Sequence, residues 1–178
     1  MLSRRVSLAL GLALGLIAQT APGQTAPPNA SKPFVDRTLG VRLTLPPGWK
    51  PYSGYSAEHL LFECDPKHPL PQCSLEIDRR KATNRTITDA DRKLWESWVS
   101  AGGMRHIIST RNFAVNRHAA YEVVEGKGEA ESRWVFVLVP ERDRLYRLTF
   151  AAHWDSRGHV QDYRAAIDAL LRSFETLP

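Results

Sequence analysis

The sequence has 178 residues, with 24 lysines and arginines against 19 aspartates and glutamates, which gives a formal net charge of +5. This length suits one domain with an extension, and the hydrophobic content of 43% is enough for a packed core. The mild positive charge gives no support to a nucleic-acid-binding role, and it is compatible with weak attraction to anionic surfaces.

The N-terminus has the layout of a cleavable export signal. Arg4 and Arg5 precede a nearly continuous apolar run at 6–18, which is followed by small and proline-rich residues. A membrane span needs about 20 apolar residues, so this run predicts a signal peptide at 1–23 and a mature start near Gln24. The two arginines fit a Sec signal and partly match a twin-arginine motif. A periplasmic or secreted protein without a membrane anchor is expected.

Residues 24–33 are rich in proline, alanine and threonine and predict a flexible leader. No repeat or later linker follows, so 34–178 is expected to form a single domain. At 41–45, apolar and polar residues alternate, which is the pattern of a half-buried strand. The turn residues of 46–49 end it.

The segments 59–64 and 73–78 predict two strands that pair as a hairpin. In one register Phe62 faces Leu75, and the flanking apolar residues of both strands share that side of the hairpin. A slip of one residue would send the two apolar sets to opposite faces. The register therefore also places Cys64 opposite Cys73, at a separation that suits a disulfide.

Cys64 and Cys73 are the only two cysteines, and a structural disulfide is the favoured interpretation for an exported protein. Closing this loop stabilises the fold by roughly 2.5 to 3 kcal/mol in the chain-entropy model, although three prolines already stiffen the loop. A redox pair normally has two residues between its cysteines. A zinc site that includes His68 would lack a fourth ligand.

Thr88 predicts a helix N-cap, and Gly102-Gly103 predicts the end of that helix. An apolar stripe at helical spacing lies between them, formed by Leu94, Trp98 and Ala101 and widened by Trp95 and Val99. Trp95 and Trp98 cannot both point directly inward. One of them is therefore a candidate for lining a groove between helix and sheet, where a peptide or small ligand docks.

A run of strands follows, expected at 105–110, 112–115, 119–126, 132–139 and 144–152. The segment 140–143, PERD, predicts a turn, and 134–139 is apolar on both faces, as in a central strand. The chain finishes with a helix expected at 158–176. Consecutive strands joined by short loops pair antiparallel, so the order of elements predicts an α+β fold.

Four segments resemble PsbP-like domains, a fold shared with the Ran-binding Mog family and DcrB-like envelope proteins. They are LGVRLTLPPGW, NFAVNRHAAYEV, RLYRLTFAA and LLRSFETL. The resemblance implies an antiparallel β-sheet sandwiched by helices, a PsbP-like αβα sandwich. It brings no catalytic residues, because these families share none. Relatives often have glycine after the asparagine of the mid-chain turn, and Arg117 follows Asn116 here, which makes a left-handed conformation less favourable.

One candidate site is a basic stretch near the first helix. A possible anion-binding patch consists of Arg79, Arg80, Lys81, Arg85, Arg92 and Lys93. It would suit lipid headgroups, cell-wall polymer or an acidic partner. The alternative is a solvated strand end and helix start, which is the more common role of a charge run.

The densest polar cluster consists of His153, Asp155, Ser156 and His159. It is compatible with a hydrolase or a weak metal site. The alternative is that Asp155 or Ser156 caps the last helix. No catalytic motif and no metal-binding pattern occurs elsewhere, so no catalytic residue, metal or cofactor is assigned. The sequence favours an exported, non-catalytic binding or accessory protein of the cell envelope whose partner is a protein or peptide.

Overall fold

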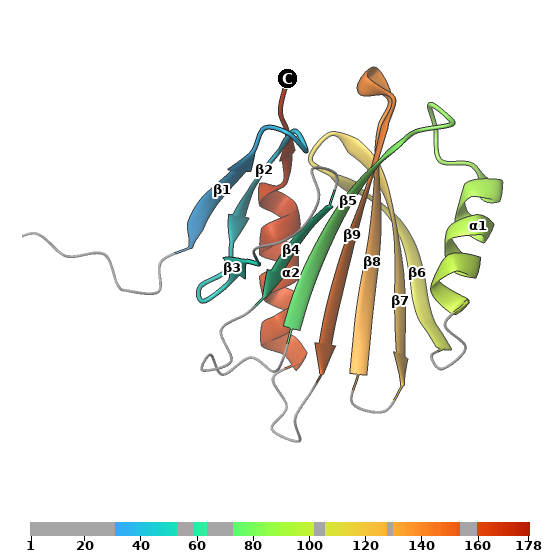
Figure 1. Cartoon of the computed structure of the whole chain (residues 1–178). Coiled ribbons are helices and arrows are strands. Elements are labelled where there is room, and N and C mark those ends of the chain that lie inside the picture. The colour runs from blue at the N-terminus through green and yellow to red at the C-terminus, as the bar shows by residue number, and fades with distance from the viewer. Residues whose placement is uncertain (1–30, 53–58, 64–72, 102–105, 128–129, 154–159) are drawn as a thin grey trace, which may run out of the picture.

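The computed structural model describes residues 31–52, 59–63, 73–101, 106–127, 130–153 and 160–178. Two antiparallel sheets and two helices make up these residues (Figure 1). The strands are β1 (Lys32–Asp36), β2 (Val41–Leu45), β3 (Lys50–Pro51), β4 (His59–Glu63), β5 (Cys73–Lys81), β6 (His106–Val115), β7 (His118–Lys127), β8 (Ala130–Val139), β9 (Arg144–His153) and β10 (Glu175–Thr176). The helices are α1 (Asp89–Ser100) and α2 (Val160–Ser173), and the short 3₁₀ helix η1 is Pro140–Arg142.

The large sheet has seven strands in the order β3-β4-β5-β9-β8-β7-β6, all antiparallel. Strands β6 to β9 follow one another in space as in sequence, because short connections make neighbours antiparallel. The expected strands at 105–110 and 112–115 are one continuous strand, β6. Arg111, between them, stays in the ladder opposite Glu122, and the only irregularity along β6 is a register shift between Ile107 and Ser109.

The β4–β5 hairpin has the register that the sequence predicts. Phe62 pairs with Leu75 and Leu60 pairs with Ile77, and the pairing can be followed to Glu63 opposite Ser74. Phe62 and Leu75 are fully buried, which explains why a one-residue slip is excluded. Cys64 and the loop after it lie outside the described residues, so the disulfide stays a prediction.

A second, three-stranded sheet in the order β1-β2-β10 was not predicted. Strand β1 begins at Lys32, so the last two residues of the predicted leader 24–33 belong to a strand. The C-terminal helix was predicted to reach Thr176, but α2 ends at Ser173. Glu175 and Thr176 instead pair with β2. Backbone pairing of these two residues with a strand more than 130 residues earlier in the chain takes them out of the helix, and no local sequence pattern predicts this pairing.

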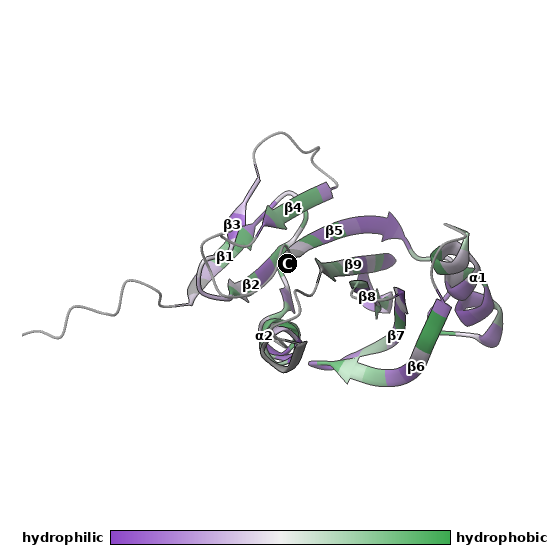
Figure 2. Ribbon diagram, turned by 90° about the horizontal axis from the view of Figure 1, so that it is seen from below, coloured by the Kyte–Doolittle hydropathy of each residue, from purple (hydrophilic) through white to green (hydrophobic). Residues whose placement is uncertain are grey.

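The two helices lie on opposite sides of the large sheet (Figure 2). Strand β8 serves both sides, because its side chains alternate. Val135 and Val137 belong to the larger core with α2 and β2, whereas Phe136 packs under α1. The prediction of a central strand with two apolar faces is confirmed. Helix α1 contributes few residues to its core, so it covers only part of its face of the sheet.

Helix α1 begins as predicted but buries a different face. Thr88 is its N-cap, and Thr88 and Asp91 form a reciprocal capping box. Of the predicted apolar stripe, only Trp95 and Val99 are buried, an i, i+4 pair on one side of the helix. Leu94 and Trp98, predicted as the centre of the buried stripe, are 47% and 37% exposed. Because Trp95 lies at the centre of the buried face of α1, Leu94 and Trp98 lie at the edges of that face.

Among the described residues, two that are not glycine adopt the left-handed conformation at tight turns. Asn116 has φ 53° in the β6–β7 turn, and Asp143 has φ 50° after η1. The sequence predicted that the left-handed position of the first turn falls on Arg117, where it would be unfavourable. The left-handed position falls on Asn116 instead, a residue type that tolerates it, and its side chain donates to the Phe174 carbonyl. The predicted PERD turn is confirmed.

Candidate functional site

A cavity of about 210 Å³ lies between α1 and the ends of three neighbouring strands. Strand β5 and the segment after it form one wall, α1 forms the second, and β8 and β9 form the floor. The lining residues are Arg80, Lys81, Ala82, Thr83, Asn84, Thr86, Ile87, Asp91, Leu94, Trp95, Trp98, Leu138 and Leu145. We call this cavity the α1 pocket.

Local interactions hold the walls of the α1 pocket in place. The Ala82 backbone N–H donates to the Asp143 carbonyl at 2.8 Å, which fastens the chain where it leaves β5. Ile87 packs against the core under α1, and Thr88 then starts the helix. The start of the helix sets which residues face the cavity, so the capping box determines where Trp95 and Trp98 lie.

The interior of the α1 pocket is apolar and partly aromatic. Trp95 is buried and stacks on Phe136, with ring centroids 4.5 Å apart and an interplanar angle of 8°. Trp98 and Leu94 border the cavity and are exposed. An exposed indole beside a concave apolar surface is a common anchor for a ligand side chain. The sequence predicted that one tryptophan of this helix lines a groove, and both Trp95 and Trp98 line this cavity. Docking of a ligand there stays a prediction.

The rim of the α1 pocket is cationic. The Arg80 guanidinium lies 5.3 Å from the centroid of the Trp98 ring, and Lys81 is exposed beside it. Within the part of the chain that the structure describes, neither Arg80 nor Lys81 forms an ion pair with a carboxylate. The strand side of the pocket therefore carries positive charge.

Asp91 is the one carboxylate that lines the pocket, and the capping box already uses it. Its oxygens accept hydrogen bonds from the Thr88 backbone at 2.9 Å and from the Asn84 side chain at 3.0 Å. Burial alone would raise the pKa of Asp91, but these hydrogen bonds outweigh burial and hold its pKa below the ordinary value. Asp91 is thus ionised at neutral pH and fixed at the helix start.

The basic residues of the predicted anion-binding patch have different partners, and anion binding by the patch stays a prediction. Arg80 and Lys81 line the α1 pocket. Arg79 does not line it and donates instead to the Thr38 carbonyl at 2.6 Å. Arg92 pairs with Asp89 and reaches Asn112 on β6. Arg85 and Lys93 are exposed and do not line the pocket.

The predicted polar cluster falls mostly outside the described residues. His153 is the last residue of β9, opposite Ala130, and 154–159 are not described. The hydrolase and weak metal hypotheses for His153, Asp155, Ser156 and His159 therefore stay predictions.

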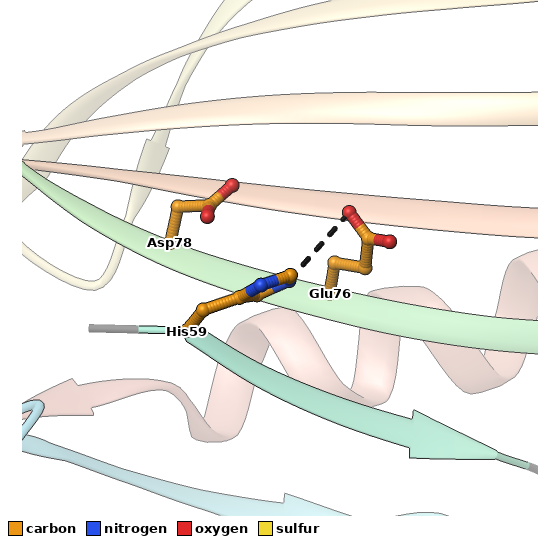
Figure 3. Close-up of side chains that lie close together, drawn as sticks. All are labelled: His59, Glu76 and Asp78. Atoms are coloured by element: carbon orange, nitrogen blue, oxygen red, sulfur yellow. Dashed lines mark ion pairs between the residues drawn. The ribbon is translucent and has the colours of Figure 1, made fainter. Parts of the chain in front are cut away.

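A different set of ligand-type side chains comes together on β4 and β5, and the sequence analysis missed it. His59, Glu76 and Asp78 each offer an atom to a group whose members all lie within 4.8 Å of one another. Figure 3 shows the three side chains on the same side of the two strands. The signal was available: the predicted hairpin register already puts His59 opposite Asp78.

Comparisons with known proteins support the fold. No protein-family model and no curated protein matches the sequence. The Ran-binding protein Mog1p of Saccharomyces cerevisiae matches at a TM-score of 0.62 and 6% identity, over 84% of this chain and 96% of that chain. Cyanobacterial PsbP from Synechocystis sp. PCC 6803 matches at 0.61 and 12% identity, over 89% and 98%. LpqN of Mycobacterium tuberculosis, involved in cell envelope biogenesis, matches at 0.52 and 10% identity, over 89% and 90%.

These likenesses confirm the predicted PsbP/Mog-like fold. At such low identities they concern the fold alone and assign no site. Among the described residues, no helix is both long enough and apolar enough to cross a membrane.

Proposed function

We propose that this chain is an exported, non-catalytic binding or accessory protein of the cell envelope. Its α1 pocket takes an acidic peptide segment of a protein partner, with one large apolar side chain inserted beside Trp98. The observation that carries this proposal is an apolar cavity whose rim has two cations with no carboxylate partner among the described residues. The pocket, with its aromatic wall, suits an apolar anchor, and the rim favours negative charge next to it.

The structural relatives are consistent with a binding role. One of them is a Ran-binding protein, and another is involved in cell envelope biogenesis. The helices on opposite sides of the sheet also agree with a PsbP-like αβα sandwich, which we propose as the architecture. Binding proteins need a rigid surface more than a reactive centre, and the capping box and the Trp95–Phe136 stack make the pocket rigid.

Short fluorescein-labelled peptides with a central phenylalanine test the pocket directly. We expect fluorescence anisotropy to report tightest binding when glutamates flank the phenylalanine, weaker binding with serines and none with lysines. Trp98→Ala is expected to weaken binding about tenfold, since exposed aromatic anchors dominate such sites. Lys81→Gln should weaken it less, and its effect should shrink as salt rises from about 0.05 M to about 0.3 M.

Matched controls come from elsewhere on the same domain. Ile108→Ala removes an exposed apolar side chain from β6, and Lys127→Gln removes an exposed lysine at the end of β7. Neither residue lines the pocket, so both variants should bind as the parent does. Equal affinity for all three peptides, or full binding by Trp98→Ala, would contradict the proposal.

We further propose that the export signal at 1–23 is removed and that Cys64 and Cys73 form a disulfide. The β4–β5 register supports the pairing, since Glu63 opposite Ser74 is the pair next to the cysteines. Intact mass analysis of protein recovered from the periplasm is expected to give a chain starting near Gln24. Reduction should add the mass of two hydrogen atoms. A mass unchanged by reduction would mean that both thiols are free.

A further inference from the structure

Three metal-ligand side chains meet on the face of the β4–β5 hairpin that faces away from the α2 core. His59 lies directly opposite Asp78, and Glu76 is two residues along the same strand on the same face. The His59 Nε2 atom is 3.8 Å from Glu76 Oε2. All three residues are half-buried. Their backbones belong to paired strands, so the register fixes the positions from which the side chains extend.

The spacing of these atoms is close to that of a metal site. Two ligands of a tetrahedral zinc ion lie about 3.3 Å apart, because each is about 2.0 to 2.1 Å from the metal. The ligand atoms here lie within 4.8 Å of one another. Side-chain rotation of partly exposed residues can close a gap of this size without moving the strands. One imidazole and two carboxylates also balance the charge of a divalent ion.

The chemistry of the set favours zinc over the hard cations. An imidazole nitrogen suits Zn²⁺ and related transition metals, whereas Mg²⁺ and Ca²⁺ prefer sites made wholly of oxygen atoms. Three protein ligands leave one tetrahedral position for water or for a group from a partner. Such an open, half-buried set predicts reversible binding.

Arg147 is the neighbour that modulates this site. Its guanidinium pairs with Asp78 and lies 5.4 Å from the centroid of the Trp134 ring. A carboxylate has two oxygens, so Asp78 can keep Arg147 on one oxygen and offer the other to a metal. Arg147 then orients the ligand from outside, as second partners of metal ligands do, while its positive charge weakens the binding of a cation.

We propose that His59, Glu76 and Asp78 form a reversible Zn²⁺ site on this face of the β4–β5 hairpin. The site is separate from the α1 pocket, since none of the three residues lines that cavity. The proposal therefore stands whether or not the pocket binds a peptide.

Calorimetric titration of the full chain with zinc chloride tests the site. We expect a binding isotherm in the micromolar range for the parent, weakened at least tenfold in both His59→Ala and Glu76→Gln, since each removes a ligand. Magnesium chloride should give no binding isotherm. His106→Ala is the matched control, because it removes an exposed histidine from β6, and it should leave zinc binding unchanged. Zinc should also raise the melting temperature of the parent but not that of His59→Ala.

Several outcomes would overturn the proposal. Absence of zinc binding by the parent would do so, as would zinc binding that is equally strong in His59→Ala and Glu76→Gln, which would place the ion elsewhere. The variants must melt without metal within a few degrees of the parent, so that a loss of binding reports a lost ligand. Glu76→Gln conserves side-chain size and serves as the test if His59→Ala does not fold.

Discussion

Replacement of Arg133 by methionine is expected to lower the free energy of unfolding by about 3 kcal/mol, because it leaves a buried carboxylate with too few partners. Arg133 on β8 and Glu122 on the neighbouring strand β7 form an ion pair, and their side chains are only 6% and 5% exposed. Arg133 also reaches Asp168 on α2 at 3.0 Å. Without Arg133, the ion pair that Glu122 keeps among the described residues is with Arg111, whose side chain is half exposed. Urea denaturation at neutral pH measures the loss.

Two comparisons sharpen this experiment. The double variant Glu122→Leu/Arg133→Met removes both buried charges, so it should be more stable than Arg133→Met alone. Arg42→Met breaks an exposed pair with Glu175 and should cost less than about 1 kcal/mol. A double variant less stable than Arg133→Met would mean that the buried Glu122 carboxylate left without Arg133 is not the cause of the lower free energy of unfolding.

Replacement of Phe136 by alanine is expected to cost about 3 to 5 kcal/mol. Phe136 is fully buried on β8 and is the ring on which Trp95 stacks, so its loss opens a cavity directly under α1. The same variant should lose affinity for the glutamate-flanked peptide, because the Trp95 wall of the α1 pocket loses its support. Thermal and urea unfolding measure the first effect, and anisotropy measures the second.

Phe136→Leu separates the effect of side-chain volume from the effect of aromatic stacking on Trp95. It keeps most of the volume and is expected to cost less than about 1.5 kcal/mol. If Phe136→Ala unfolds like the parent, then α1 is not anchored through this contact, and the rigidity argued for the α1 pocket would be wrong.

The local sequence was informative for the pairing of β4 with β5 and for the start of α1. The alternation in β4 and β5 predicted their register, because a shift by one residue would expose Phe62 and Leu75. Thr88 predicted the start of α1 for a local reason as well, since the cap is completed by Asp91 three residues later. The register also contained the His59–Asp78 pair, whose two residues are too far apart in the sequence to match a short metal-binding motif.

Sequence patterns did not predict that the charged side chains of Glu122 and Arg133 are buried. Glu122 and Arg133 occur in strands and read as ordinary polar positions, although both are buried. They pair with each other, and Arg133 also pairs with Asp168, which lies 35 residues further along on α2. A charge is tolerated in the core only with a partner, and only the folded chain reveals which partner it has.

The sequence by itself determined the order of β2 and of β4 to β9 along the chain, the β4–β5 register, the start of α1 and the aromatic residues from which a groove could be built. The tertiary structure alone decided that Trp95 faces inward and Trp98 borders the α1 pocket, and that β10 joins β2. It also decided that Arg79 donates to the Thr38 carbonyl while Arg80 and Lys81 line the pocket. The reason is physical. Capping and alternation act between near neighbours in the chain, whereas the burial of one helix face and the pairing of a charge depend on residues brought together only by folding.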